Sequence, residues 1–87
     1  MTIHRKVKRV IDGDTFQTHT KVNGSNYIRL AGVNAPEKYQ RGGSQATQRL
    51  KRQIQGKVVT LKPVGRSYGR VVAKVRKNRR LVGWIEK

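Results

Sequence analysis

The stretch TFQTHTKVNGSNYIRLA, residues 15–31, contains two runs typical of β-strands on either side of a tight turn. The first run, residues 15–22, is rich in threonine and alternates about Phe16. The dipeptide Asn23-Gly24 follows, and both residue types tolerate the positive φ of a two-residue hairpin turn. The chain returns as a second apolar run at residues 27–33. These patterns predict a β-hairpin, and the other predicted elements lie before and after it in the chain.

Three other segments have the short, interrupted apolar pattern of strands. They are residues 4–13, residues 57–64, which are expected to end at Pro63, and residues 71–77. The stretch GRSYGR, residues 65–70, separates the last two and is predicted to be a loop because glycine begins and interrupts it.

One segment, SQATQRLKRQIQG at residues 44–56, has the periodicity of a helix. Ser44 is the expected N-cap and Gly56 the expected C-terminal stop. Its apolar stripe recurs every four residues and consists of Ala46, Leu50 and Ile54. Three strands, a helix and two strands predict a mainly β domain, a five-stranded barrel of the OB type. An SH3-like barrel has the same strand count, but the helix between strands three and four favours the OB arrangement.

The composition describes a very basic single domain, residues 1–87, with 21 Lys and Arg against four Asp and Glu and a formal net charge of +17. Such an excess predicts polyanionic partners, above all nucleic acid. Cysteine is absent, which excludes disulfides and thiolate metal sites. Neither a signal peptide nor a membrane segment is expected, and the compartment stays open between the cytoplasm and a secreted mature form. We expect a monomer.

Half of the four acidic residues lie in VIDGDTF, residues 10–16. Asp12-Gly13 alone is a hairpin signal, so a simple turn between two strands is one interpretation. The turn does not require Asp14, and Glu37 is a third carboxylate at a predicted strand–loop junction. With the amide of Asn34, these oxygens are the ligand types that a hard divalent cation prefers. The competing interpretation is that the acids pair with neighbouring Lys and Arg.

Two arginines stand out from the general basic background. Arg29 lies in the otherwise apolar run YIRLAGV, where a core-facing charge would need a partner; the alternative is a side chain that faces outward. Arg70 follows Tyr68 and Gly69 in the predicted loop. An aromatic ring and an arginine there suit base stacking and phosphate binding, and the alternative is a basic surface turn.

Several separate motifs together resemble the staphylococcal (thermonuclease) nuclease family, from about Val7 to about Val75. They occur in the family's order and with similar spacing: VIDGDTF (10–16), IRLAGVNAPE (28–37), SQATQRLKRQIQGK (44–57), VTL (59–61) and SYGRVVAKV (67–75). The resemblance implies a five-stranded OB barrel with helices. It also implies calcium-dependent hydrolysis of DNA and RNA phosphodiesters.

The resemblance assigns the metal site to residues near both acidic motifs. Asp14 matches the metal-binding aspartate of the family and Asp12 its nearby acidic companion. Asn34 stands where the family normally has a second metal-binding aspartate, so one formal charge is lost and calcium is expected to bind more weakly. Ala35 is expected to offer only its backbone carbonyl.

The resemblance also implies catalytic and substrate-binding roles. Arg29 and Arg70 match the two phosphate-contacting arginines, Glu37 matches the glutamate proposed as general base, and Tyr68 matches a tyrosine near the bound nucleotide. Two guanidinium groups and a cation neutralise the charge of the pentavalent phosphorane, and a carboxylate orients or deprotonates water. Ser67 replaces a frequently basic residue, which is expected to weaken nucleotide binding.

Two functions from different classes are favoured over a third, an RNA-binding protein of the ribosomal type, which would have no use for the acidic residues. The first is a calcium-dependent nuclease, favoured by the presence of both arginines, Asp14 and Glu37. The second is a non-catalytic OB module that binds nucleic acid through its charge, with a degenerate metal site at Asn34. The chain ends at Lys87, where family members usually continue through a last helix; residues 80–87 are expected to form a short strand or the start of that truncated helix.

Overall fold

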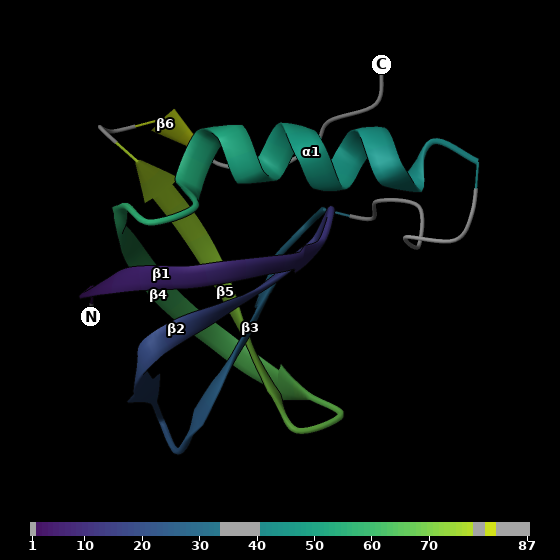
Figure 1. Cartoon of the computed structure of the whole chain (residues 1–87). Helices are drawn as coiled ribbons and strands as arrows, with labels where there is room; N and C mark the ends of the chain where they lie inside the picture. Colours follow the sequence, from purple (N-terminus) through teal and green to yellow (C-terminus); the bar gives the residue numbers. More distant parts are fainter. Residues whose placement is uncertain (1, 34–40, 78–79, 82–87) are drawn as a thin grey trace.

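The computed structural model describes residues 2–33, 41–77 and 80–81 of the chain. They form a strongly curved β-sheet with a helix lying across one end of it (Figure 1). In chain order the elements are β1 (Ile3–Asp12), β2 (Thr15–Val22), β3 (Ser25–Leu30), α1 (Gly43–Ile54), β4 (Val58–Ser67), β5 (Arg70–Lys77) and β6 (Arg80–Leu81).

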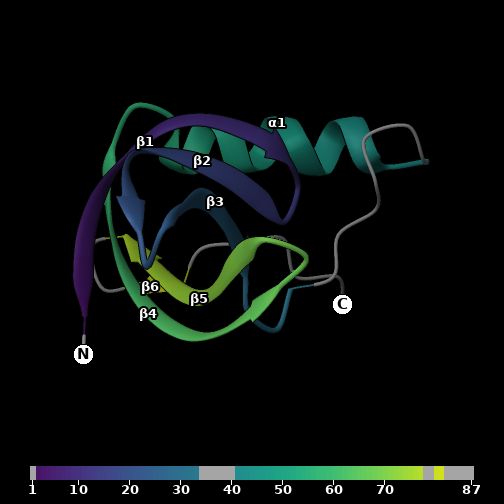
Figure 2. The ribbon, with the colours of Figure 1, turned by 90° about the horizontal axis from the view of Figure 1, so that it is seen from below.

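The first five strands close into a barrel. Strand β1 pairs antiparallel with β2 on one side and with β4 on the other, and β2 and β4 pair antiparallel with β3 and β5. A parallel pairing of β3 with β5, with Ile28 opposite Val71, completes the ring, which Figure 2 shows from below. A closed five-stranded barrel with a helix between strands three and four is the OB-fold arrangement. The predicted fold class is therefore confirmed.

The barrel interior is filled by one cluster of apolar side chains, to which all five strands contribute. Val10, Phe16 and Ile28 are register partners across β1, β2 and β3, and all three are buried. Since side chains alternate along a strand, the neighbouring rows point outward, toward solvent and the candidate site. The other members of this core include Val7, Val22, Leu30, Val59, Leu61, Val71, Ala73 and Val75.

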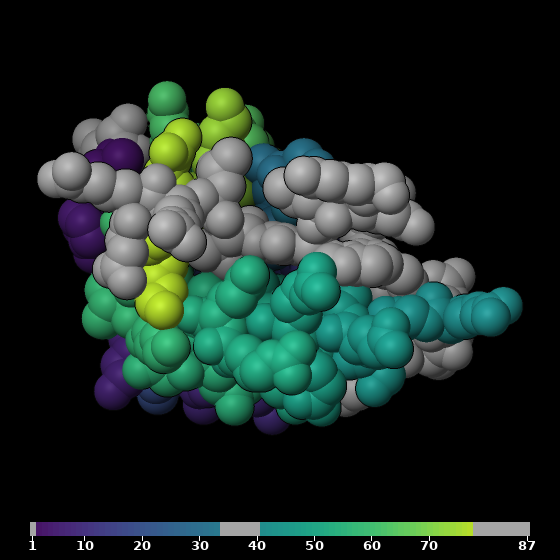
Figure 3. All heavy atoms as spheres, turned by 90° about the horizontal axis from the view of Figure 1, so that it is seen from above, coloured from purple at the N-terminus to yellow at the C-terminus, as the bar shows by residue number. Residues whose placement is uncertain are grey.

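Helix α1 closes one end of the barrel with the stripe that the sequence predicted. Ala46, Leu50 and Ile54 are buried, and the outer side of the helix forms much of the face in Figure 3. The prediction of Ser44 as N-cap is wrong: the helix begins at Gly43, and Gly42, at φ 82°, occupies the cap position without a side-chain cap hydrogen bond. A left-handed Gly42 starts the helix two residues earlier than a Ser44 cap would.

The turns follow the sequence closely in one hairpin and less closely in another. Asn23 and Gly24 have φ values of 47° and 86°, which confirms the predicted two-residue turn between β2 and β3. Expecting a strand end at Pro63 and a loop over residues 65–70 was wrong, because β4 continues to Ser67. A register irregularity between Pro63 and Gly65 accommodates the proline, as strand prolines generally require.

The ends of two predicted strands differ from the structure. The run at 27–33 is a strand only to Leu30, although Ala31 still donates its N–H to the carbonyl of Ala73 and Val33 packs against the core. Residues 80–81 form the short strand β6, which pairs with β5, and residues 82–87 lie outside the described part of the chain. Within the part that the structure describes, no helix is long and apolar enough to cross a membrane.

Candidate active site

The turn between β1 and β2 presents Asp14 to the rest of the site. Asp12 and Thr15 are the last register pair of the two strands, and the chain turns through Gly13 and Asp14 between them. The backbone N–H of Asp14 donates to Oδ1 of Asp12 at 3.1 Å, an Asx-type contact that fixes the turn. Asp12 therefore shapes the turn that carries Asp14, which confirms the turn interpretation, and the site interpretation of this motif stays a prediction.

The carboxylate of Asp14 is held from two sides while keeping 12% of its side-chain surface exposed. The hydroxyl of Thr15 donates to its Oδ1 at 3.0 Å. Its Oδ2 lies 3.6 Å from Nη2 of Arg29, an ion pair longer than a good hydrogen bond. The Thr15 hydroxyl and the Arg29 guanidinium thus each face one oxygen of this carboxylate.

Arg29 is positioned by the pairing of β2 with β3. Its register partner is Thr15, so its side chain lies on the same outer face of the barrel as the Thr15 hydroxyl. Its Nη1 donates weakly to the backbone oxygen of Leu30 at 3.4 Å, and the guanidinium is half-buried. The N–H of Leu30 donates to the carbonyl of Asp14 at 2.8 Å, which ties the end of β3 to the turn. Arg29 thus faces outward and is paired at the same time.

Arg70 reaches the same cluster from β5. Its Nη1 donates to Oγ1 of Thr15 at 3.3 Å. The Thr15 hydroxyl therefore links Arg70 to the Asp14 carboxylate, and Asp14 in turn faces Arg29. Sequence reasoning missed Thr15; the available signal was a hydroxyl residue directly after the second aspartate of the motif.

Tyr68 lies at the tip of the hairpin between β4 and β5. It has φ 50° and is 94% exposed, and Gly69 after it has φ 75°. This tip is attached to the neighbouring hairpin, since Ser25 Oγ donates to the carbonyl of Gly69 at 2.9 Å. Arg66 donates to the carbonyl of Asn23 at 2.8 Å and strengthens the same attachment. An exposed ring on an anchored tip, two residues before Arg70, is available to a ligand.

Three of the predicted site residues, Asn34, Ala35 and Glu37, lie outside the described residues. Among the residues that the structure does describe, no group of three His, Cys, Asp or Glu side chains could hold a metal ion. What they offer a hard cation is the carboxylate of Asp14. Toward the described residues, its Oδ2 makes only the 3.6 Å contact with Arg29, and a carboxylate oxygen is a ligand type that calcium prefers.

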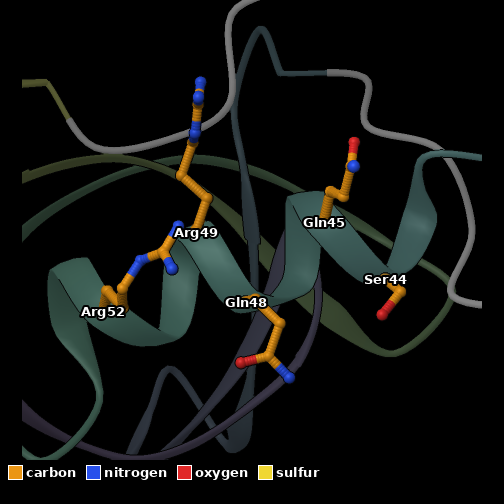
Figure 4. Close-up of a pocket in the computed structure, with 5 residues that line it drawn as sticks. All are labelled: Ser44, Gln45, Gln48, Arg49 and Arg52. Carbon is orange, nitrogen blue, oxygen red and sulfur yellow. The ribbon is translucent and has the colours of Figure 1, made fainter.

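A separate hollow runs along the exposed side of α1 (Figure 4). Its described lining consists of polar and cationic side chains: Ser44, Gln45, Gln48, Arg49 and Arg52. None of these five belongs to the cluster around Asp14, and none is a carboxylate. The hollow therefore adds basic surface rather than a second candidate for hydrolytic chemistry.

Comparison with known proteins shows the family of the chain. Residues 27–83, more than half of the chain, match the model of the family described as staphylococcal nuclease homologue. The chain belongs to this family. Over 74 residues, 84% of this chain, it is 39% identical to a protein of Escherichia coli named as an uncharacterized endonuclease. A protein of Escherichia coli O157:H7 with the same name matches equally well. The chain spans about half the length of these curated relatives, 48% of each.

Proposed function

We propose that this domain hydrolyses phosphodiester bonds of DNA, RNA or both, with calcium as its cofactor. The observation that carries the proposal is the convergence of two guanidinium groups on one turn: Arg29 lies 3.6 Å from Asp14, and Arg70 donates to Thr15 at 3.3 Å. Two arginines from different strands beside a single anchored carboxylate suit a doubly charged phosphate in its transition state. Membership of the nuclease family and the endonuclease-named relatives support the same function.

The proposed roles follow from the family resemblance and, for Arg29, Arg70 and Tyr68, from where the side chains are held. Arg29 and Arg70 bind the scissile phosphate and neutralise the charge that develops on it, because their guanidinium forks match phosphate oxygens. Glu37 orients or deprotonates the attacking water. Tyr68 contacts the adjoining nucleotide from the hairpin tip. The charge of +17 draws the polyanionic substrate to the site and makes its association sensitive to salt.

Asp14 is the proposed carboxylate ligand of calcium. The amide oxygen of Asn34 and the backbone carbonyl of Ala35 are the other proposed protein ligands. Bound there, calcium would supply positive charge to the phosphate oxygens and polarise a water molecule. The Thr15 hydroxyl donates to Oδ1 of Asp14, and Oδ2, which faces Arg29, would be the oxygen offered to the ion. An amide at position 34 supplies an oxygen without a charge, so weak calcium binding belongs to the proposal.

Digestion of single-stranded DNA and RNA by the purified protein tests this function. Cleavage is expected with added calcium and is expected to stop with a chelator. Glu37→Gln and Arg70→Gln should each remove most of the activity, whereas Arg76→Gln, an exposed arginine on β5 outside the site, should keep it. Equal activity of Glu37→Gln and the unmodified protein would reject the assignment of the base, and activity in chelator would reject the cofactor.

A non-catalytic nucleic-acid-binding module is the second candidate. The feature that favours it is the Asp14–Arg29 ion pair combined with the missing charge at Asn34, because an aspartate already neutralised by arginine attracts a cation less strongly. This candidate predicts metal-independent binding with a steep salt dependence and no cleavage. The digestion and a filter-binding titration in chelator therefore separate the two functions.

A further inference from the structure

A row of polar and aromatic side chains lies beside the candidate site on the outside of the barrel. Arg9, Gln17 and Tyr27 are register partners across β1, β2 and β3. The next row toward the turn, Val10, Phe16 and Ile28, is buried in the core, so the Arg9 row faces outward. Three adjacent strands thus present a cation, an amide and a phenol side by side.

The members of this row are partly organised already. Nε of Arg9 donates to Oε1 of Gln17 at 3.0 Å, which orients the guanidinium over β2. Within the described residues, the terminal nitrogens of Arg9 and the amide nitrogen of Gln17 make no hydrogen bond. Tyr27 is 42% exposed. The row therefore presents free donors beside an accessible aromatic ring.

The position of the row is tied to the candidate site by strand geometry. Gln17 follows Thr15 by two residues on β2, and Tyr27 precedes Arg29 by two residues on β3. Residues two apart on a strand share a face and lie about 7 Å from each other. On β5, Val71 is the register partner of Ile28, and Arg70 directly precedes it. Arg70 therefore lies near the end of this row from the β5 side. A substrate strand whose phosphate meets Arg29 and Arg70 would pass over this row with its next nucleotide.

We propose that Arg9, Gln17 and Tyr27 form a nucleotide subsite that selects single-stranded nucleic acid, an inference that rests on the proposed function. A base stacks on the ring of Tyr27, the amide of Gln17 donates to it, and Arg9 binds the phosphate that follows. Stacking requires an unpaired base with an open face, which a duplex does not offer. The preference for single-stranded over double-stranded nucleic acid would therefore come from these three residues on the outside of the barrel. It would not come from the residues that act on the phosphate.

Binding measured in chelator tests the subsite without any cleavage. The probe is a fluorescently labelled oligothymidylate, compared with a blunt DNA duplex of equal length. Tyr27→Ala is expected to weaken binding of the single strand about tenfold, within the range for loss of one stacked base, and to leave duplex binding unchanged. Tyr27→Phe should restore single-strand binding, because the ring is retained. Arg9→Gln should reduce the salt slope on single strands by about 0.7, the value for one phosphate contact.

A charge-matched control variant and the possible outcomes separate the proposed subsite from the proposed hydrolysis. Arg76→Gln removes an equal charge from an exposed position on β5 and should leave the preference for single strands unchanged. If Tyr27→Ala binds the single strand as tightly as the unmodified protein, or weakens both probes equally, the subsite is rejected. If the protein never cleaves but Tyr27→Ala shows the selective loss, the proposed hydrolysis fails and the subsite stands. Circular dichroism of each variant confirms that the barrel is intact.

Discussion

The guanidinium of Arg70 donates to the hydroxyl of Thr15 at 3.3 Å, although the two residues are 55 positions apart in the chain. Thr15 in turn donates to Asp14 at 3.0 Å. A single hydroxyl therefore contacts both Arg70, a proposed phosphate-binding residue, and Asp14, the proposed metal ligand. The contact between Arg70 and Thr15 depends on the pairing of β5 with β3, whereas the contact between Thr15 and Asp14 is local.

Thr15→Val tests this linkage because valine keeps the shape of threonine and removes the hydroxyl. We expect about a tenfold fall in turnover, since Arg70 and Asp14 lose their common partner, and a loss of about 1 kcal/mol in the free energy of unfolding. Nuclease kinetics and urea denaturation measure the two effects. Thr15→Ser should recover most of the turnover.

Thr18→Val is the matched control for that experiment. Thr18 is also buried on β2, and its hydroxyl donates to the carbonyl of Thr20 at 2.7 Å, away from the site. It should destabilise the fold by a similar amount and leave turnover unchanged. If both variants lose turnover equally, the effect of Thr15 belongs to stability alone.

Arg29→Lys keeps the charge beside Asp14 but loses the planar fork. Lysine offers phosphate a point charge rather than two parallel hydrogen bonds, so turnover is expected to fall about a hundredfold. The measurement is single-turnover cleavage at saturating enzyme, which excludes an effect on binding alone. Arg76→Lys on β5 should cleave at the normal rate. Unchanged cleavage by Arg29→Lys would mean that Arg29 only balances the charge of Asp14.

The site shows which relationships sequence reasoning can reach. Asp14, Arg29 and Arg70 were predicted because a chain so rich in bases rarely uses acids and because the motifs resemble a known family. That Asp14 pairs with Arg29 was one of the open alternatives, and only the β2–β3 register decides it. Thr15 was missed because its role depends on Arg70, and β3 and β5 are parallel neighbours that no local pattern indicates.

Leu50→Ala tests how strongly α1 contributes to the barrel. Leu50 is 1% exposed and packs in the core that the strands form. Truncating a buried leucine costs about 2–5 kcal/mol, a large part of the stability of so small a domain. Urea denaturation should show a lower midpoint. Gln48→Ala, on the exposed side of the same helix, should change the free energy of unfolding by less than about 0.5 kcal/mol.

The same helix illustrates why the interior of the fold was easier to predict than its boundaries. Ala46, Leu50 and Ile54 were found from their spacing, because burial of one helix face leaves a regular trace in the sequence. The start of the helix was placed too late because serine is a common N-cap residue and Ser44 was chosen. In the structure Gly42, in the left-handed conformation, occupies the cap position. Similarly, Pro63 was read as a strand end, since a bulge depends on the partner strand rather than on the proline itself.

The interaction between Lys57 and Lys77 is expected to make the stability of the fold depend on pH. A side-chain hydrogen bond with Lys57, then desolvation and charge repulsion, lowers the pKa of Lys77 below 10.5. Between that lowered pKa and 10.5 the unfolded chain binds more protons, so the free energy of unfolding rises with pH in this window. Lys57→Gln should therefore stabilise the fold at neutral pH, and the gain should disappear above pH 10.5. Urea denaturation at low salt measures both.

Lys21→Gln, which removes a charge from the exposed surface of β2, is the control for general repulsion. In a chain with a net charge of +17 it will also give some stabilisation. The increase in the free energy of unfolding caused by Lys21→Gln should persist at high pH more than the increase caused by Lys57→Gln. Identical pH profiles for the two variants would contradict a specific interaction between Lys57 and Lys77.

Asn34→Asp is expected to strengthen calcium binding. The substitution restores a carboxylate where the family normally has one, and an added formal charge is expected to lower the calcium concentration for half-maximal cleavage about tenfold. A calcium titration of the nuclease assay measures this. Gln48→Glu adds the same charge on α1 outside the site and should leave the titration unchanged. If Asn34→Asp needs as much calcium as the unmodified protein while Asp14→Asn abolishes cleavage, Asp14 binds the ion without help from position 34.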